Sequence, residues 1–290
     1  MTASTDGLHA LRLGYSPDPD DAFMWWAIAS PGESARLPTP PYRFQPVVAD
    51  VQTLNDRAER VGDLEITGIS AGAYPSVAGR YRVTCCGASF GIGYGPRLVA
   101  RRPIGAEALA RSGVRIASPG SRTTAALVTM LALDVGPERL TPVPFEQTID
   151  RTLAGEFDAA IVIHEGQLTF ERAGLHLVLD LGAWWEGETG LPLPLGLNVI
   201  RRDLDDQWGP GTIDAIERHL SASIEYGLSH RTAALKHASR FGRGISDADN
   251  DAFVRMYVNE MTRDMGDRGR QAIDALIAHG AARGLCPAVS

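Results

Sequence analysis

A histidine stands at the position where a parallel sheet presents its reactive groups. His164 follows the apolar run 157–163, FDAAIVI, which is typical of a buried strand. Ligands of open parallel sheets bind beyond the carboxyl ends of the strands, and an imidazole titrates near neutral pH. Position alone leaves two interpretations open, a catalytic imidazole or a histidine that only hydrogen-bonds a nearby carbonyl group. We expect the other histidines, in a terminal tail, a strand start or helices, to be structural or solvated.

A second candidate is the turn Ser118–Thr124, SPGSRTT, which joins a predicted strand to a predicted helix. The first N–H groups of a helix have no partner within it, so this turn suits an anion. The hydroxyl groups of Ser121, Thr123 and Thr124 offer further donors. The same residue types also favour an ordinary helix N-cap, and position leaves both interpretations open.

Two further strand ends are candidates for the same site. Ser16–Asp21 joins a strand to a helix; the alternative is that Asp20 or Asp21 simply caps that helix. Gly68–Ser70 ends a third predicted strand. The glycines of residues 91–95, GIGYG, lack the dinucleotide-binding spacing and open no helix. No Walker, metal-ligand or nucleophile-elbow motif is present, so we do not expect those classes of site.

Composition narrows the class of protein. The 290 residues carry a net charge of -7, which argues against general binding to nucleic acid or anionic membranes. Three cysteines, two of them adjacent, make a poor disulfide framework and indicate a reducing compartment. The polar first ten residues do not resemble a signal peptide, and no window is apolar enough to span a membrane. We therefore expect a cytoplasmic protein.

Short β-rich runs alternate with amphipathic stretches, which predicts βαβ units and a mainly parallel sheet. The predicted strands are 11–15, 43–49, 64–69, 114–117, 141–145, 159–163, 175–180 and 197–200. The predicted helices are 21–29, 53–61, 71–79, 123–133, 147–154, 213–228, 232–241, 247–260 and 268–283. Two prolines in residues 191–196, LPLPLG, argue against a central strand there.

Gly- and Pro-marked breaks near residues 96–102 and 196–201 predict two crossings between lobes. We therefore predict a two-lobed α/β fold of the periplasmic-binding-protein type, with a cleft between the lobes and a helical C-terminal part. Residues 1–96 plus 200–290 form the first predicted lobe, and residues 97–199 form the second. A single larger sheet is the alternative.

Several motifs, in order along the first 200 residues, resemble 1,4-dihydroxy-6-naphthoate synthase of the futalosine route to menaquinone. The matching segments are Leu13-Gly-Tyr-Ser-Pro-x-Pro-x-Asp21 with Phe23, Asp50-Val-x-Thr-Leu-Asn55, Ile69-Ser70 with Tyr74, Gly91-x-Gly-x-Gly-Pro96, Pro119-Gly-x-x-Thr-Thr-Ala125, Ile163-His-Glu165, Asp180-Leu-Gly182 and Thr189-Gly-Leu-Pro-Leu-Pro-Leu-Gly196. The combination is far more specific than any one motif. The helical C-terminal part is less diagnostic.

The resemblance implies conversion of cyclic dehypoxanthine futalosine to 1,4-dihydroxy-6-naphthoate with release of the sugar-derived fragment. It implies His164 as the base, no metal or redox cofactor, and a small-molecule carboxylate as the partner. Residues implied or proposed to contact substrate are Ser16, Asp21, Asn55, Gly68, Ile69, Ser70, Thr123, Thr124 and Ala125. A role for Glu165 in orienting the imidazole is a weaker prediction.

The sequence departs from the family pattern at two places. Asp20, Asp21 and Ala22 stand where the first loop often has Asn before Asp and Thr after it, and Gly68 replaces a lysine of some members. These changes bear on the contacts and on the substrate. The alternatives are the related chorismate-dehydrating enzyme, a solute-binding protein, and a non-catalytic cytoplasmic protein that binds a carboxylate. The sequence does not reveal the oligomeric state.

Overall fold

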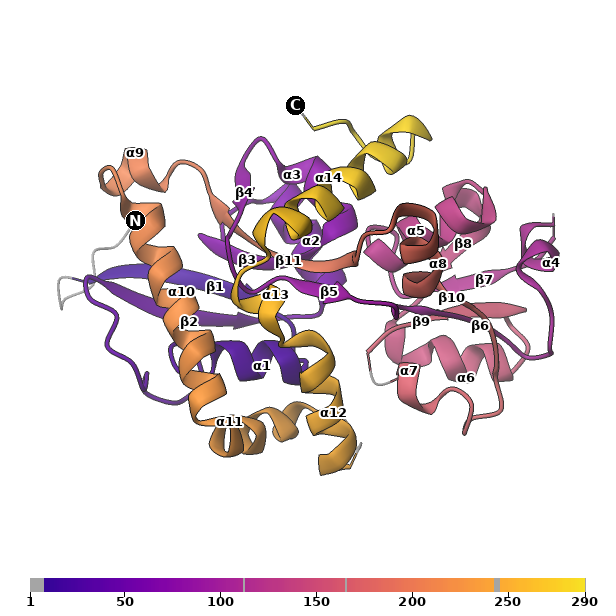
Figure 1. Cartoon of the computed structure of the whole chain (residues 1–290), viewed down its shortest axis with the longest axis horizontal. Helices are drawn as coiled ribbons and strands as arrows, with labels where there is room; N and C mark the ends of the chain where they lie inside the picture. The colour runs from indigo at the N-terminus through magenta and orange to yellow at the C-terminus, as the bar shows by residue number, and fades with distance from the viewer. Residues whose placement is uncertain (1–7, 112, 165, 243–245, 290) are drawn as a thin grey trace. The chain divides into compact units, whose positions relative to one another are not determined.

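The computed structural model describes residues 8–111, 113–164, 166–242 and 246–289 (Figure 1). Internal contacts divide the chain into two compact units. Unit 1 contains Met1–Ile69, Val77–Ser89 and Gly196–Gly266, and unit 2 contains Ser70–Ser76, Phe90–Leu195 and Asp267–Ser290. The lobes predicted from the sequence stay a prediction. This division differs from them in residues 70–76, 90–96 and 267–290, which belong to unit 2, and in residues 196–199, which belong to unit 1.

Unit 1 is built on a mixed sheet in which the strands follow the order β2-β1-β3-β11-β4, while β5 pairs with β11. Strand β1 runs parallel to both β2 and β3, whereas β11 runs antiparallel to β4. The strands of this sheet are β1 (His9–Tyr15), β2 (Tyr42–Val48), β3 (Ile66–Ser70), β4 (Tyr81–Val83), β5 (Ser89–Gly91) and β11 (Leu193–Arg201). The last residue of β3, the last two of β5 and the first three of β11 belong to unit 2. The parallel part matches the prediction, and the antiparallel part comes from segments near the predicted crossings.

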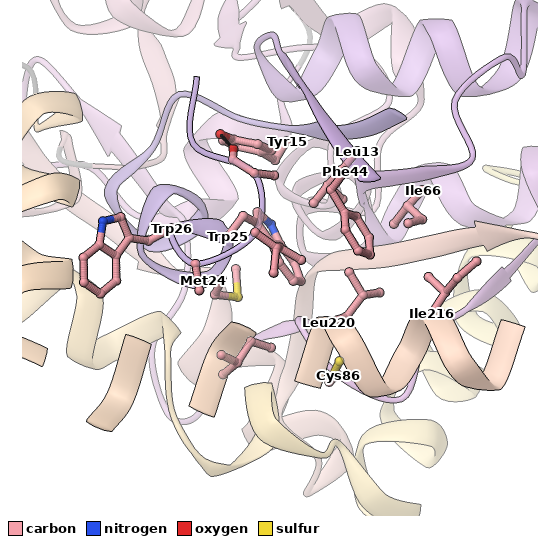
Figure 2. Packing of buried hydrophobic residues seen from close by; sticks show 14 of the residues in the cluster. Leu13, Tyr15, Met24, Trp25, Trp26, Phe44, Ile66, Cys86, Ile216 and Leu220 are labelled. Carbon is pink, nitrogen blue, oxygen red and sulfur yellow. Dashed lines mark hydrogen bonds between the residues drawn. The ribbon is translucent and has the colours of Figure 1, made fainter. Parts of the chain in front are cut away.

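The core of unit 1 forms where apolar side chains of the sheet meet helix α1 (Figure 2). Phe23, Met24 and Trp25 of α1 are fully buried, and Leu220 of α10 packs in the same cluster. The hydroxyl group of Ser223 donates to the carbonyl oxygen of Met24 at 2.6 Å, which ties α10 to α1. The helices of unit 1 are α1 (Pro19–Trp25), α2 (Val51–Arg60), α9 (Leu204–Trp208), α10 (Thr212–Ser229), α11 (Arg231–Ala238), α12 (Asp247–Tyr257) and α13 (Glu260–Arg263), with a 3-10 turn at Ser239–Phe241.

Unit 2 is built on a second sheet, in the order β10-β6-β9-β7-β8. Strand β7 runs parallel to its neighbours β8 and β9, while β6 runs antiparallel to β9 and β10. The strands are β6 (Arg97–Ala100), β7 (Ile116–Ser118), β8 (Leu140–Pro142), β9 (Ala159–Val162) and β10 (His176–Asp180).

Helix α5 is apolar on almost every side and is therefore buried within unit 2. It packs against β9 and α8, and α6 packs against β9 and β7 (Figure 1). The helices of unit 2 are α4 (Ala106–Ala110), α5 (Thr124–Leu133), α6 (Thr148–Leu153), α7 (Gly166–Thr169), α8 (Leu181–Thr189) and α14 (Gly266–Ala282). The first residue of α14 belongs to unit 1. Unit 2 also has 3-10 turns at Ala71–Ala73, Pro137–Arg139 and Phe145–Gln147. Helix α3 (Tyr74–Val77) begins in unit 2 and ends in unit 1.

The predicted α/β class and the helical C-terminal part are confirmed, but one strand prediction is wrong. Strand β11 begins at Leu193 and includes Pro194, in the segment where the prolines argued against a central strand. Proline is tolerated because it stands at the start of the strand, ahead of residues 199–201 that pair with β4. Strands β4, β5 and β6, of three or four residues each, were not predicted from the sequence.

Candidate active site

In unit 2, three parallel strands bring residues distant in the sequence to one edge of the sheet. Strands β8, β7 and β9 are neighbours, so their carboxyl ends meet at the same edge. Thr123 follows β7, Phe145 follows β8 and His164 follows β9. This edge is therefore the position at which ligands of parallel sheets bind.

His164 has an unusual backbone and an aromatic neighbour. Its φ angle is 54°, in the left-handed region, which costs a non-glycine residue roughly 1–2 kcal/mol. Such conformations cluster at functional sites, where the surrounding structure maintains them. The imidazole packs edge-on with Phe145, with ring centroids 4.9 Å apart and ring planes at 72°. The sequence had no signal for Phe145, because its contact depends on the pairing of distant strands. The prediction about Glu165 lies outside the described residues.

The Thr124 hydroxyl group joins three segments of unit 2. It accepts a hydrogen bond from the Gly72 N–H at 3.0 Å and donates one to the Leu195 carbonyl oxygen at 2.7 Å. The approach favours glycine, because a Cβ at residue 72 would lie 3.2 Å from the Thr123 carbonyl oxygen, so the backbone of α5 would have to shift by a few tenths of an ångström. The structure thereby places Ser70, two residues before Gly72, near the start of α5.

Thr123 forms the N-cap of α5, as the capping interpretation predicted. Its side-chain oxygen accepts a hydrogen bond from the Ala126 N–H at 3.1 Å and donates its proton to the Gly120 carbonyl oxygen. The hydroxyl protons of Thr123 and Thr124 are therefore committed to backbone oxygens. The donors that a helix start leaves for a ligand are its first N–H groups, which belong here to Thr124 and Ala125. Binding of an anion at this point stays a prediction.

In unit 1, the parallel strands β1 and β3 likewise end at one edge. The Asp21 carboxylate accepts hydrogen bonds from the Ser16 N–H at 2.8 Å and from its hydroxyl group at 2.7 Å. The alternative that Asp20 or Asp21 caps the helix is wrong: Asp18 occupies the N-cap, and Asp21 closes the loop instead. Gly68 and Ile69 lie near the end of β3, at the same edge.

The loop after β1 carries three carboxyl groups close together, those of Asp18, Asp20 and Asp21. Burial, together with the nearby Asp21 and Asp18, raises the pKa of the Asp20 carboxyl well above its usual range. The predicted site residue Asn55 lies on α2 and is completely buried. The structure therefore brings Ser16, Asp21 and Gly68 to one edge of unit 1 and places Asn55 inside a helix.

The described part of the chain holds no cluster of three His, Cys, Asp or Glu side chains arranged as metal ligands. The three cysteines are free, with Cys85 exposed and Cys86 buried. Hydrogen bonding to Cys86 lowers the pKa of the Cys85 thiol to about 7. Among the described helices, none has both the length and the apolar character to cross a membrane.

Solved structures of low sequence identity define the class of fold. An alkanesulfonate-binding protein from Xanthomonas axonopodis has a TM-score of 0.65 and 14% identity, covering 96% of this chain and 94% of its own. The ligand-binding component of an ABC-type import system from Staphylococcus aureus has a TM-score of 0.65 and 12% identity, covering 97% and 94%. The predicted periplasmic-binding-protein type of fold is thus confirmed.

The chain belongs to the menaquinone biosynthesis family, whose sequence profile matches residues 11–282. A 1,4-dihydroxy-6-naphthoate synthase from Thermus thermophilus is 39% identical over 96% of each chain. Another from Streptomyces coelicolor is 33% identical over 96% of this chain and 95% of its own. A crystal structure of a protein from Archaeoglobus fulgidus has a TM-score of 0.86 and 37% identity, covering 96% and 98%. The resemblance drawn from the sequence motifs is confirmed.

Proposed function

We propose that this chain converts cyclic dehypoxanthine futalosine to 1,4-dihydroxy-6-naphthoate, with His164 as the base. The observation that carries the proposal is His164 itself, held in a left-handed conformation directly after β9 in a chain that is 39% identical to a synthase of this name. We further propose that the enzyme works in the cytoplasm, because its curated relatives are biosynthetic enzymes.

In the proposed reaction, the His164 imidazole removes a proton from a carbon next to a carbonyl group. A histidine suits this step because its two protonation states are both accessible near neutral pH. The electron pair of the broken C–H bond becomes part of the new ring π-system, and the sugar-derived fragment leaves with the electrons of the bond that breaks. Aromatisation of the naphthoate drives the expulsion. Phe145, packed against the imidazole, limits the orientations available to the ring.

The carboxylate of the substrate binds, in this proposal, at the start of α5. Its first N–H groups, on Thr124 and Ala125, point along the helix axis, and the positive end of the helix dipole favours an anion. Ser70 adds a hydroxyl group beside them, since Gly72 is hydrogen-bonded to Thr124. The roles of Thr123 and Thr124 are thus to shape this helix start, while backbone atoms make the contacts.

Product analysis tests the proposal directly. Purified protein is incubated with cyclic dehypoxanthine futalosine, and 1,4-dihydroxy-6-naphthoate is measured by chromatography with mass detection. A parallel reaction with chorismate tests the related dehydrating enzyme. Formation of 1,4-dihydroxy-6-naphthoate from cyclic dehypoxanthine futalosine supports the proposal. Turnover of chorismate alone would assign the chain to the other activity, and binding of the carboxylate without turnover would make it a binding protein.

A further inference from the structure

His164 lies in a turn between β9 and α7, within unit 2. Strand β9 ends at Val162 and α7 begins at Gly166, so residues 163–165 connect the two elements. The His164 carbonyl oxygen accepts a hydrogen bond from the Gln167 N–H at 3.1 Å, which ties the turn to the start of α7. The left-handed backbone of His164, with φ 54°, persists only because such contacts maintain it. The position of α7 therefore helps to set the direction in which the imidazole points.

Gly166 is the residue at which α7 packs against the end of β9. A Cβ atom at this position would lie 2.4 Å from Val162 Cγ1 and 3.5 Å from Ile149 Cδ1. The Cβ and Val162 Cγ1 would have to separate by 1.0 Å, from 2.4 to 3.4 Å, before ordinary van der Waals contact begins. The φ angle of Gly166 is not in the left-handed region, so the backbone conformation would accept another residue. The close packing on Val162 is therefore what favours glycine here.

Val162 has little freedom to give way to such a side chain. It is 2% exposed and packs in the apolar core of unit 2, and a β-branched side chain has few rotamers. The far end of α7 is held as well, because Phe170 packs in the same core and its N–H donates to the Gly166 carbonyl oxygen at 3.0 Å. The turn at His164 is thus the part that a side chain at position 166 would displace.

We propose that Gly166 is a positioning residue for the base: its lack of a side chain lets α7 close on Val162 and so fixes the direction of the His164 imidazole. The inference rests on the proposed function, because it takes His164 as the base. Gly166 acts through His164 and not by contact with the substrate. Phe145 limits the orientation of the ring from one side, and Gly166 sets the backbone from which the ring extends.

Steady-state kinetics of Gly166→Ala with cyclic dehypoxanthine futalosine test this assignment. A displacement of about 1 Å can cost roughly 100-fold in rate, so we expect kcat to fall about 10- to 100-fold with little change in KM. The matched control is Gly187→Ala on α8 of the same unit, where a Cβ would meet nothing within 4 Å. We expect this control to keep full activity. A folded Gly166→Ala enzyme with the native kcat would overturn the inference.

The nuclear magnetic resonance signals of the His164 ring report its position without any turnover. The Phe145 ring packs edge-on with its centroid 4.9 Å away, so its ring current contributes to the chemical shifts of the imidazole protons. We expect Gly166→Ala to move these signals, assigned by their loss in His164→Asn, and Gly187→Ala to leave them in place. Unmoved signals in Gly166→Ala contradict the inference. A native protein that makes no product refutes the proposed function, while these signals still decide whether Gly166 positions the imidazole.

The double variant Val162→Ala/Gly166→Ala separates this contact from a general loss of stability. Truncation of Val162 removes Cγ1 and vacates the space that a methyl group at position 166 enters. We therefore expect both kcat and the His164 signals to return toward their native values. Signals that stay as far from native as in Gly166→Ala would show that the contact with Val162 does not position the ring. Where Gly166→Ala alone does not fold, the double variant decides, since His164 signals that differ from the native ones overturn the inference.

Discussion

The two sheets of this protein end in loops of opposite electrostatic character. In unit 1, the loop beyond β1 offers the carboxyl groups of Asp20 and Asp21. In unit 2, the loops beyond β7 and β9 offer the N–H groups at the start of α5 and the imidazole of His164. Both edges follow the rule that loops at the carboxyl ends of strands bind ligands, but they suit different chemical groups.

The difference gives each unit its own electrostatic preference. The acidic loop of unit 1 disfavours an anion, whereas the helix start of unit 2 favours one. The following predictions test this division, beginning with the largest expected effect.

Replacing the base of unit 2 should have the largest effect on turnover. We expect His164→Asn to lower kcat by roughly 100- to 10,000-fold, because loss of a general base removes proton transfer from the transition state. Substrate affinity and the melting temperature should change little. The control is His176→Asn, an exposed histidine on β10 of the same unit, which should retain full activity. Full activity of a folded His164 variant would remove this residue from the mechanism.

Replacing Thr124 tests whether the helix start of unit 2 depends on its hydroxyl group. Thr124→Val leaves the Gly72 N–H and the Leu195 oxygen without this partner, so we expect the free energy of unfolding to fall by about 1–3 kcal/mol. Chemical denaturation measures the change. Thr129→Val is the control within α5, since it removes one bond to the Ala125 oxygen and should cost less. Equal losses in both variants would argue against a special role for Thr124.

Phe145 sharpens the comparison because its ring packs edge-on against His164, the candidate base of unit 2. We expect Phe145→Leu to lower kcat about 2- to 10-fold with little change in KM, as the edge-on contact with His164 is lost. Steady-state kinetics over a range of pH separate this effect from a loss of folded protein. Phe157→Leu, a substitution in the core of unit 2, should lower the melting temperature and leave kcat of the folded enzyme intact.

The smallest effect is expected for a substitution of Asp20, in the acidic loop of unit 1. Burial beside two other carboxyl groups raises its pKa, so the folded state binds the Asp20 proton more tightly than the unfolded state does. This contribution to stability is present below the unfolded pKa of about 3.9 and is lost as pH rises through the folded pKa. Asp20→Asn should therefore raise the melting temperature at neutral pH and leave it unchanged below about pH 4. The exposed Asp206→Asn is the control; a shift of the same size in both variants would contradict the explanation.

Local patterns in the sequence determined most of the regular elements and the main candidate. The apolar run before His164 predicts β9, because a short run of buried apolar residues indicates a strand without any knowledge of its neighbours. The threonines before α5 predict a helix start, because capping acts between residues a few positions apart. Family motifs then identified His164 as the base to be tested.

Tertiary structure decided the features that depend on contacts between distant segments. Pro194 lies within β11 although its local preference argues against a strand, because it stands at the start of that strand, ahead of the residues 199–201 that pair with β4. The contact between Phe145 and His164 follows from the order of strands in the second sheet. The pairing of β3 with β11 places Gly68 beside Asn198, although 130 positions separate the two residues in the sequence. No local pattern encodes such neighbours, since sheet pairing is selected by the burial and hydrogen bonding of the whole unit.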